Sequence, residues 1–85
     1  MLQQFNQLMD YIETHLTDEI SGKEISKIVG MSEYHFKRMF SYLAGMSLNE
    51  YIKNRRLAEA NVDLVKGEKV TDIAFKYGYQ SIEGF

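Results

Sequence analysis

Four neighbouring residues carry side chains that can hydrogen-bond to, or stack on, a planar polar ligand: Tyr34, His35, Lys37 and Arg38. The guanidinium of Arg38 can present two donors to O6 and N7 of guanine, which discriminates between base pairs by about 1–3 kcal/mol. Lys37 can donate to a base or to a phosphate, and Tyr34 can pack on a thymine methyl or a sugar. These residue types therefore allow the recognition of double-stranded nucleic acid, with His35 as a further candidate.

Each of these residues also has a plain structural interpretation. Arg38 could pair with Glu33 or another nearby carboxylate on the surface. Tyr34 could be half-buried and shield the preceding turn. His35 could donate near the start of its helix or pack on a neighbouring helix. The four side chains alone do not decide between these alternatives.

The residues lie in a segment that is predicted to be a helix over about 32–44. Ser32 is a favourable N-cap, and Gly30 is a natural left-handed stop for a preceding helix. Apolar side chains that share one face by their spacing should point inward, and polar ones should point outward. The inward set is Phe36, Met39 and Phe40, and the outward set is Tyr34, Lys37, Arg38 and Ser41. A helix, a glycine turn and this second helix match a helix-turn-helix, although an ordinary surface helix in a small bundle would show the same pattern.

The remaining chain also reads as helices, all but the first of which end at glycines. An amphipathic helix spans about 2–16, and Ser21 and Ser47 each begin a capping box in which the serine hydroxyl accepts the N–H of Glu24 or Glu50. The second box starts a long helix over about 47–66, roughly 30 Å in length. A short apolar stripe (Val70, Ile73 and Tyr77) follows, and we expect a partner chain to cover it unless the end of the chain frays. The prediction is an all-α protein.

Bulk properties exclude several classes of protein. The chain has 85 residues, enough for one domain, and it has no cysteine, which excludes disulfides and thiolate metal sites. No apolar run is long enough to span a membrane, and the N-terminus does not resemble a signal peptide, so a cytoplasmic location is expected. The two histidines lie twenty residues apart without a third partner placed for a metal or a catalytic triad. We therefore expect no enzyme activity, no metal and no cofactor.

The charges are distributed unevenly along the chain. The net charge is −2, but residues 34–56 carry five basic residues against Glu50 alone, a balance of +4. Such a basic centre is typical of an electrostatic footprint for DNA. Lys53, Arg55 and Arg56 are predicted phosphate contacts, and the capped helix starts at Ser32 and Ser47 can also bind phosphate. Alternatively, Arg56 bridges the long helix to a carboxylate.

The helix-turn-helix pattern occurs a second time near the end of the sequence. Glu24-Ile25-Ser26 and Gly30 align with Asp72-Ile73-Ala74 and Gly78 at an offset of 48, and Ser32 and Phe36 then align with Ser81 and Phe85. This predicts a first lobe over about 2–45, a linker helix over about 47–66 and a partial second lobe over about 69–85. A linker of this length could hold two reading helices near the spacing of about 34 Å between successive major grooves. The second reading helix starts within the sequence but lacks residues that would match Lys37 to Phe40.

These features resemble the DNA-binding region of the AraC/XylS family of bacterial transcription regulators. The residues that carry the resemblance are Ile25-Ser26-Lys27-Ile28-Val29-Gly30-Met31-Ser32, His35-Phe36-Lys37-Arg38-Met39-Phe40, Gly45-Met46-Ser47, Tyr51-Ile52, Arg56-Leu57, Ala60, Ile73-Ala74, Gly78-Tyr79, Ser81 and Phe85. The resemblance implies that Tyr34, Lys37 and Arg38 contact bases with His35 beside them. It places Ser81, Ile82 and Glu83 at the start of the second reading helix. Ser26 departs from the usual alanine, a mild change.

The resemblance also implies partners and a larger protein. Double-stranded DNA is the expected ligand, and RNA polymerase is the expected protein partner of the full-length regulator. The sequence around residues 40–45 and 76–79 is similar to the sequence of family members that carry a C-terminal sensor domain of the gyrase-inhibitor type. Because the family unit runs further than this sequence, we expect a fragment whose own DNA binding is weak and largely non-specific.

The resulting hypothesis is a reader module of a bacterial transcription regulator, with the helix over about 32–44 in the major groove. Two alternatives stay open: a helical protein-interaction module, and a truncated fragment without specific DNA binding. An interaction module would carry apolar residues on the exposed face where Lys37 and Arg38 stand, and the sequence has none there.

Overall fold

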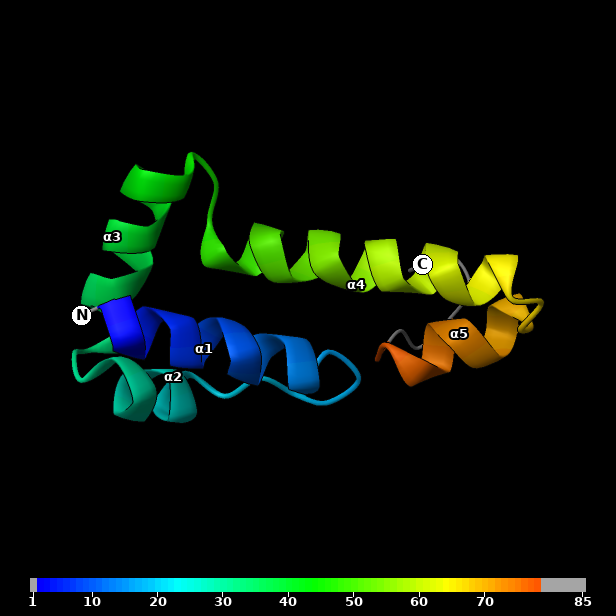
Figure 1. Ribbon diagram of the computed structural model, residues 1–85, viewed down its shortest axis with the longest axis horizontal. Helices are drawn as coiled ribbons and strands as arrows, with labels where there is room; N and C mark the ends of the chain where they lie inside the picture. The colour runs from blue at the N-terminus through cyan, green and yellow to red at the C-terminus, as the bar shows by residue number, and fades with distance from the viewer. Residues whose placement is uncertain (1, 79–85) are drawn as a thin grey trace.

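The computed structural model describes residues 2–78, and this part of the chain is helical without strands. The helices are α1 (Leu2–Thr14), α2 (Gly22–Val29), α3 (Glu33–Ala44), α4 (Leu48–Val65) and α5 (Val70–Lys76), shown in Figure 1. The predicted all-α class is confirmed, and each helix lies within about two residues of its expected position. Across residues 2–78, no helix is both long and apolar enough to cross a membrane.

Serine caps begin α2, α3 and α4, and left-handed glycines end α2 and α3. The Oγ atoms of Ser32 and Ser47 accept backbone N–H groups three residues further on, at 3.1 and 3.0 Å. Ser21 differs, because its Oγ accepts the N–H of Lys23 at 3.2 Å instead of the predicted N–H of Glu24. That prediction was wrong in its partner but not in its cap, since an N-cap side chain can satisfy either the second or the third helical N–H.

Glycines in the left-handed conformation reverse the chain on both sides of α3. Gly30 has a φ of 71° after α2, and Gly45 has a φ of 75° after α3. Residues other than glycine rarely adopt this backbone conformation. The two turns set α3 across the ends of its neighbours: it stands upright at one end of the molecule while α1 and α4 run along the long axis (Figure 1).

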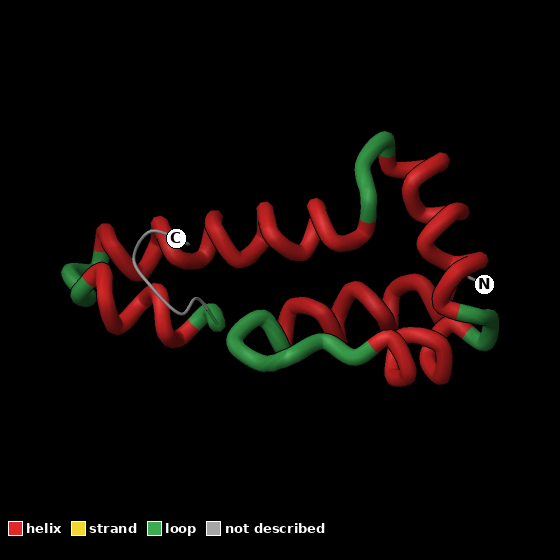
Figure 2. The backbone as a smooth tube through the Cα atoms, turned by 180° about the vertical axis from the view of Figure 1, so that it is seen from behind, coloured by secondary structure: helices red, strands yellow, loops and turns green. Residues whose placement is uncertain are grey.

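The molecule is elongated, with principal extents of 40 × 20 × 20 Å. The helices contact each other in pairs: α1 with α2, α2 with α3, α3 with α4, and α4 with α5. The tube view in Figure 2 shows that α4 bridges the two ends, from α3 at its start to α5 at its finish. The long helix is thus the element that both ends of the molecule share.

The core is one continuous group of buried apolar side chains that every helix supplies. Leu8, Ile12, Phe36, Leu48 and Ile73 are at most 1% exposed. In α3, Phe36 and Phe40 are buried as predicted, with ring centroids 6.1 Å apart, and Met39 is half-buried. The inward face of α3 therefore anchors this helix in the core and leaves its other face to solvent.

The short helix α5 needs no partner chain to cover its apolar stripe. Ile73 and Tyr77 are buried within the chain itself, and only Val70 remains 41% exposed. The expectation of a partner chain over an exposed stripe was therefore wrong for Ile73 and Tyr77, and its alternative, a frayed end after about Gly78, lies outside the described residues. The cause is that α5 folds back onto the second half of α4, which sequence spacing alone does not reveal.

A polar network joins α5 to α4. The Oη of Tyr77 donates to Oδ2 of buried Asp63 at 2.8 Å, and Nζ of Lys76 donates to the same oxygen at 3.1 Å. The hydrogen bond from Tyr77 and the bond from Lys76 lower the pKa of Asp63. Burial, aided by Asp63, raises the pKa of Tyr77 to about 12. The network thus compensates the burial of the carboxylate and orients α5.

Candidate nucleic-acid interface

The outward face of α3 gathers the side chains that the sequence singled out. Tyr34, Lys37, Arg38 and Ser41 line one shallow depression on this helix. Phe36 and Phe40, on the opposite face, are 1% and 5% exposed and hold α3 in place. The predicted division of α3 into an inward and an outward face is therefore confirmed.

Tyr34 supports Arg38. Nη1 of Arg38 donates to Oη of Tyr34 at 3.3 Å, and the guanidinium carbon lies 5.7 Å from the centre of the Tyr34 ring. Tyr34 is 64% exposed, so its half-buried alternative is wrong. Among residues 2–78 no carboxylate lies within salt-bridge distance of Arg38, so its alternative pairing with Glu33 is wrong as well. A stacked guanidinium has fewer conformations to lose when it binds a ligand.

Glu33 pairs with Lys37 instead. Oε2 of Glu33 lies 2.7 Å from Nζ of Lys37, one helical turn away, and the side chains are 43% and 37% exposed. The Glu33 carboxylate also lies against Gly22 at the start of α2. Sequence reasoning missed this pair, although acidic and basic residues four apart on a helix are a recognisable signal.

Ser32 and His35 form a small unit at the start of α3. Besides accepting the backbone N–H of His35, the Ser32 Oγ lies 2.8 Å from Nδ1 of the His35 ring. Because the hydroxyl oxygen already accepts the backbone N–H, the hydroxyl can donate its own hydrogen bond to Nδ1. This arrangement favours the tautomer with the ring proton on Nε2. His35 thus takes part in the cap of α3, but with Nδ1 as an acceptor where the structural alternative expected the ring to donate, and the ring is exposed.

The basic residues of α4 separate into different environments. Arg55 binds two carboxylates, Glu13 on α1 at 2.7 Å and Glu59 at 2.9 Å. The hydrogen bond to Glu13, followed by the attraction of that carboxylate and of Glu59, raises the pKa of Arg55. Lys53, by contrast, is exposed and has no salt-bridge partner among residues 2–78.

Arg56 holds the long helix against the segment after α1. Its Nε donates to the carbonyl oxygen of Leu16 at 2.9 Å, and its Nη2 donates to that of Asp18 at 2.8 Å. The alternative that Arg56 bridges to a carboxylate is therefore wrong, because both acceptors are main-chain carbonyls. A phosphate contact by Arg55 or Arg56 would require either residue to give up these partners.

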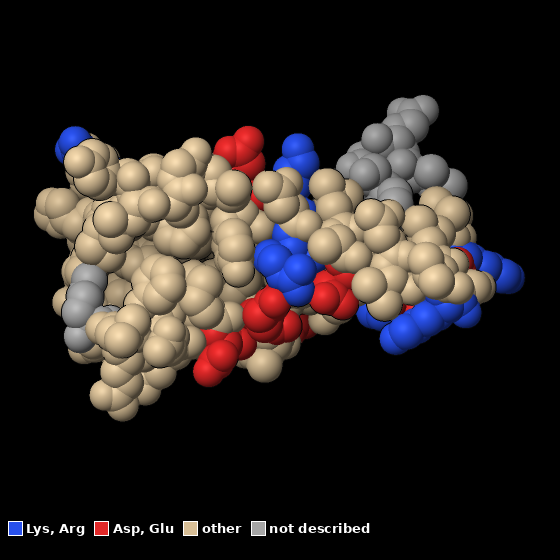
Figure 3. All heavy atoms as spheres, turned by 45° about the horizontal axis from the view of Figure 1, so that its top comes forward, with Lys and Arg blue, Asp and Glu red and all other residues tan. Residues whose placement is uncertain are grey.

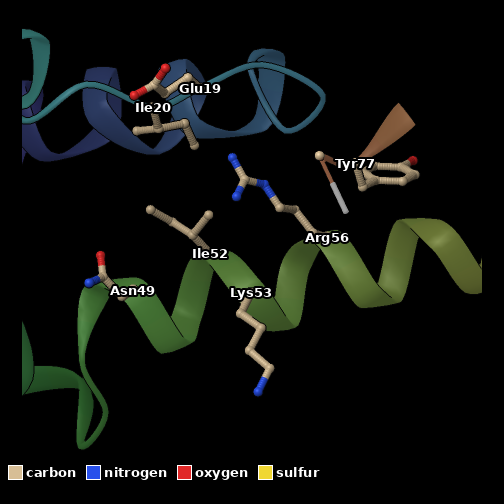
Figure 4. A pocket seen from close by; sticks show the side chains of 8 residues that line it. Glu19, Ile20, Asn49, Ile52, Lys53, Arg56 and Tyr77 are labelled. Carbon is tan, nitrogen blue, oxygen red and sulfur yellow. The ribbon is translucent and has the colours of Figure 1, made fainter. Parts of the chain in front are cut away.

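Figure 4 shows Arg56 beside a pocket of about 440 Å³ between α4 and residues 19–20. Arg56 and Ile52 point toward the segment that contains Ile20, while Lys53 points away on the other side of α4. The Nε–H and one Nη2–H of Arg56 donate to carbonyl oxygens. We therefore interpret the pocket as the boundary between two packed segments and not as a ligand site.

Opposite charges lie next to each other near the middle of the molecule. In Figure 3, basic side chains near the middle of the molecule adjoin a cluster of acidic ones. The positive balance of residues 34–56 is therefore partly neutralised in space, at Arg55 by Glu13 and Glu59 and at Lys37 by Glu33. The remaining predicted site residues, Ser81, Ile82 and Glu83, lie outside the described residues.

Comparison with known proteins identifies the family. The family model of the helix-turn-helix domain matches residues 25–85, which is most of the chain. The chain therefore belongs to this family. Its sequence features resemble the AraC type of the domain. An uncharacterized HTH-type transcriptional regulator of Staphylococcus aureus (strain COL) is 36% identical over 81 residues, which cover 94% of this chain. The uncharacterized HTH-type transcriptional regulator YbfP of Bacillus subtilis (strain 168) is 38% identical over 78 residues, 91% of this chain.

The relatives are much longer than this chain. The match covers 11% of the Staphylococcus aureus protein and 26% of YbfP. The similarity therefore concerns one region of each relative.

Proposed function

We propose that this chain is the reader module of a transcriptional regulator, and that the full-length protein binds double-stranded DNA in a sequence-dependent manner. The observation that carries the proposal is the exposed group of Tyr34, Lys37, Arg38 and Ser41 on the helix that follows the turn, opposite a buried anchor. Family membership and the names of the relatives support the same function.

The dimensions of α3 suit the major groove. Its 12 residues make a helix about 18 Å long, and the groove of B-DNA is wide enough to admit an α-helix. With α3 in the groove, Arg38 is the candidate for a bidentate contact with guanine, and Tyr34 supports its guanidinium. Lys37 can donate to an adjacent base, and an Nε2–H on His35 can donate to a base edge or a phosphate.

Contacts with the DNA backbone would set the register of α3. Lys53 is the best placed of the three predicted basic residues of α4, because it is exposed and points away from α1. The starts of α3 and α4 at Ser32 and Ser47 offer backbone N–H groups to phosphates. Arg55 and Arg56 enter the proposal chiefly as residues that position α4.

The wider organisation stays a prediction. The chain divides into a first lobe over about 2–45, a linker helix over about 47–66 and part of a second lobe over about 69–85. In the whole protein, RNA polymerase is the predicted partner, a C-terminal sensor domain is the predicted source of control, and the location is predicted to be cytoplasmic.

Selection from a random duplex library with the full-length protein, followed by binding assays with its Arg38→Ala variant, tests the proposal. We expect the variant to lose affinity for the selected site by roughly 5- to 150-fold, the equivalent of about 1–3 kcal/mol, and to lose far less on random DNA. Lys66→Ala, which removes an exposed positive charge at the far end of α4, is the control and should change both affinities little. An equal loss of affinity for the selected site and for random DNA would mean that Arg38 contacts only phosphate. The absence of binding to any duplex would refute the proposed function.

A further inference from the structure

The carboxylate of Glu33 occupies a defined position between two elements. It binds the ammonium of Lys37 at 2.7 Å on one side and lies against Gly22 of α2 on the other. A Cβ atom at position 22 would overlap the carboxylate as it lies here, so Gly22 and the flexible end of Glu33 are in close contact. By comparison, the exposed pair of Lys27 and Glu24 is looser, with 3.7 Å between its charged atoms.

Lys37 lies within the face that is proposed to contact DNA, and Glu33 is its partner beside that face. Lys37 lines the same depression as Tyr34 and Arg38, and Glu33 is the only acidic residue in α3. A carboxylate at this place repels phosphates and competes with them for Lys37. It thus opposes the sequence-independent part of DNA binding, which depends on the neutralisation of phosphates by basic side chains.

We propose that Glu33 is a specificity-determining residue, which keeps Lys37 paired until a correct base sequence offers a further acceptor. This inference rests on the proposed function. An ammonium has three N–H groups, so Lys37 can keep one on Glu33 and donate another to a base. On random DNA, Lys37 can reach only phosphates, and the Glu33 carboxylate repels a phosphate but not a neutral base, so Lys37 gains little there. Glu33 therefore lowers non-specific affinity more than specific affinity.

Glu33→Gln tests the proposal, because it removes the charge and keeps the shape beside Gly22. Binding to the selected duplex and to random duplexes is measured over a range of salt concentrations. We expect affinity for random DNA to rise on the order of three- to tenfold, with a smaller rise on the selected site. The slope of log affinity against log salt should become steeper by about 0.9 on random DNA, since Lys37 then neutralises a phosphate in full.

Glu24→Gln is the matched control, because it frees Lys27 from a surface pair on α2. It should leave the ratio of specific to non-specific affinity unchanged. In a Lys37→Gln background, Glu33→Gln should lose most of its effect on that ratio. The ammonium resonance of Lys37, followed by NMR, should shift in Glu33→Gln and not in Glu24→Gln.

The outcomes separate the two proposals. If the chain binds no duplex, both the proposed function and this inference fail. If it binds DNA but Glu33→Gln raises both affinities equally, or acts undiminished in the Lys37→Gln background, only the inference fails. Circular dichroism and urea unfolding of each variant show whether the fold is kept, and a Glu33→Gln protein that stays folded with an unchanged affinity ratio also overturns the inference.

Discussion

Arg56 offers the sharpest test of the structure, because its sequence position suggests one role and its contacts indicate another. A phosphate contact predicts that its loss weakens DNA binding and spares the fold. Hydrogen bonds to the carbonyls of Leu16 and Asp18 predict the reverse. The informative changes are Arg56→Gln, which removes the charge and the planar fork, and Arg56→Lys, which keeps the charge alone.

The expected loss of stability follows from the two hydrogen bonds. A bond from a charged donor contributes about 1.5–3 kcal/mol when it is well buried. Here the bond to Leu16 is partly buried and the bond to Asp18 is exposed, so a total of about 2 kcal/mol is expected for Arg56→Gln. With a urea m-value near 1 kcal/mol/M, the unfolding midpoint should fall by about 2 M. The melting temperature should fall by roughly 10 °C.

Arg56→Lys should recover less than half of this stability, because an ammonium cannot place two fixed N–H groups on two carbonyls. Urea unfolding followed by circular dichroism measures the stability, and DNA binding is measured at a temperature where every variant is folded. Lys53→Gln, less than one turn away and on the other side of α4, is the control. It should leave the free energy of unfolding within about 0.5 kcal/mol of the original value and should weaken binding to all DNA.

One combination of results would refute the reasoning about Arg56. An unchanged urea midpoint in Arg56→Gln, together with weakened DNA binding that Arg56→Lys restores, would establish a phosphate contact. The hydrogen bonds to the two carbonyls would then contribute nothing measurable to stability.

Two further predictions concern the core and the junction of α4 with α5. Phe36→Ala should cost about 3–5 kcal/mol in urea unfolding, because Phe36 is 1% exposed, whereas Tyr42→Ala, on a side chain that is 89% exposed, should change stability by less than about 0.5 kcal/mol. Because the pKa of Asp63 is lowered on folding, its contribution to stability is present above the pKa of the unfolded state and is lost as the pH falls through the folded value. The pKa of Tyr77 is raised from 10.0 to about 12, so its contribution is complete below pH 10 and is lost as the pH rises toward 12. Tyr77→Phe should remove this alkaline component from a pH series of urea unfolding, and an unaltered alkaline limb would contradict the assignment.

The positions of the helices were predictable because local chemistry determines where a helix begins and ends. Ser32 and Ser47 cap α3 and α4 as predicted, and Gly30 and Gly45 adopt the left-handed conformation. The buried and exposed faces of α3 were predictable for a similar reason, since helical periodicity places Phe36 away from the polar residues. Hence the all-α class and the candidate reading face both followed from the sequence.

The partners of the charged side chains were not predictable in the same way. Arg55 meets Glu13, and Arg56 meets the carbonyl of Leu16, across about 40 positions of sequence. Sequence proximity suggested that all the basic residues between 34 and 56 form one footprint.

The sequence by itself therefore determined the helices, their ends and the exposed group on α3, because these depend on interactions within a few residues. Only the tertiary structure decided which charges remain available. The ion pair with Glu13 on α1 engages Arg55, and the carbonyls of the segment after α1 engage Arg56. Within α3, Glu33 engages Lys37. The long-range contacts of Arg55 and Arg56 depend on how the helices pack, so the sequence reveals that a basic centre exists and the fold determines how much of it can meet DNA.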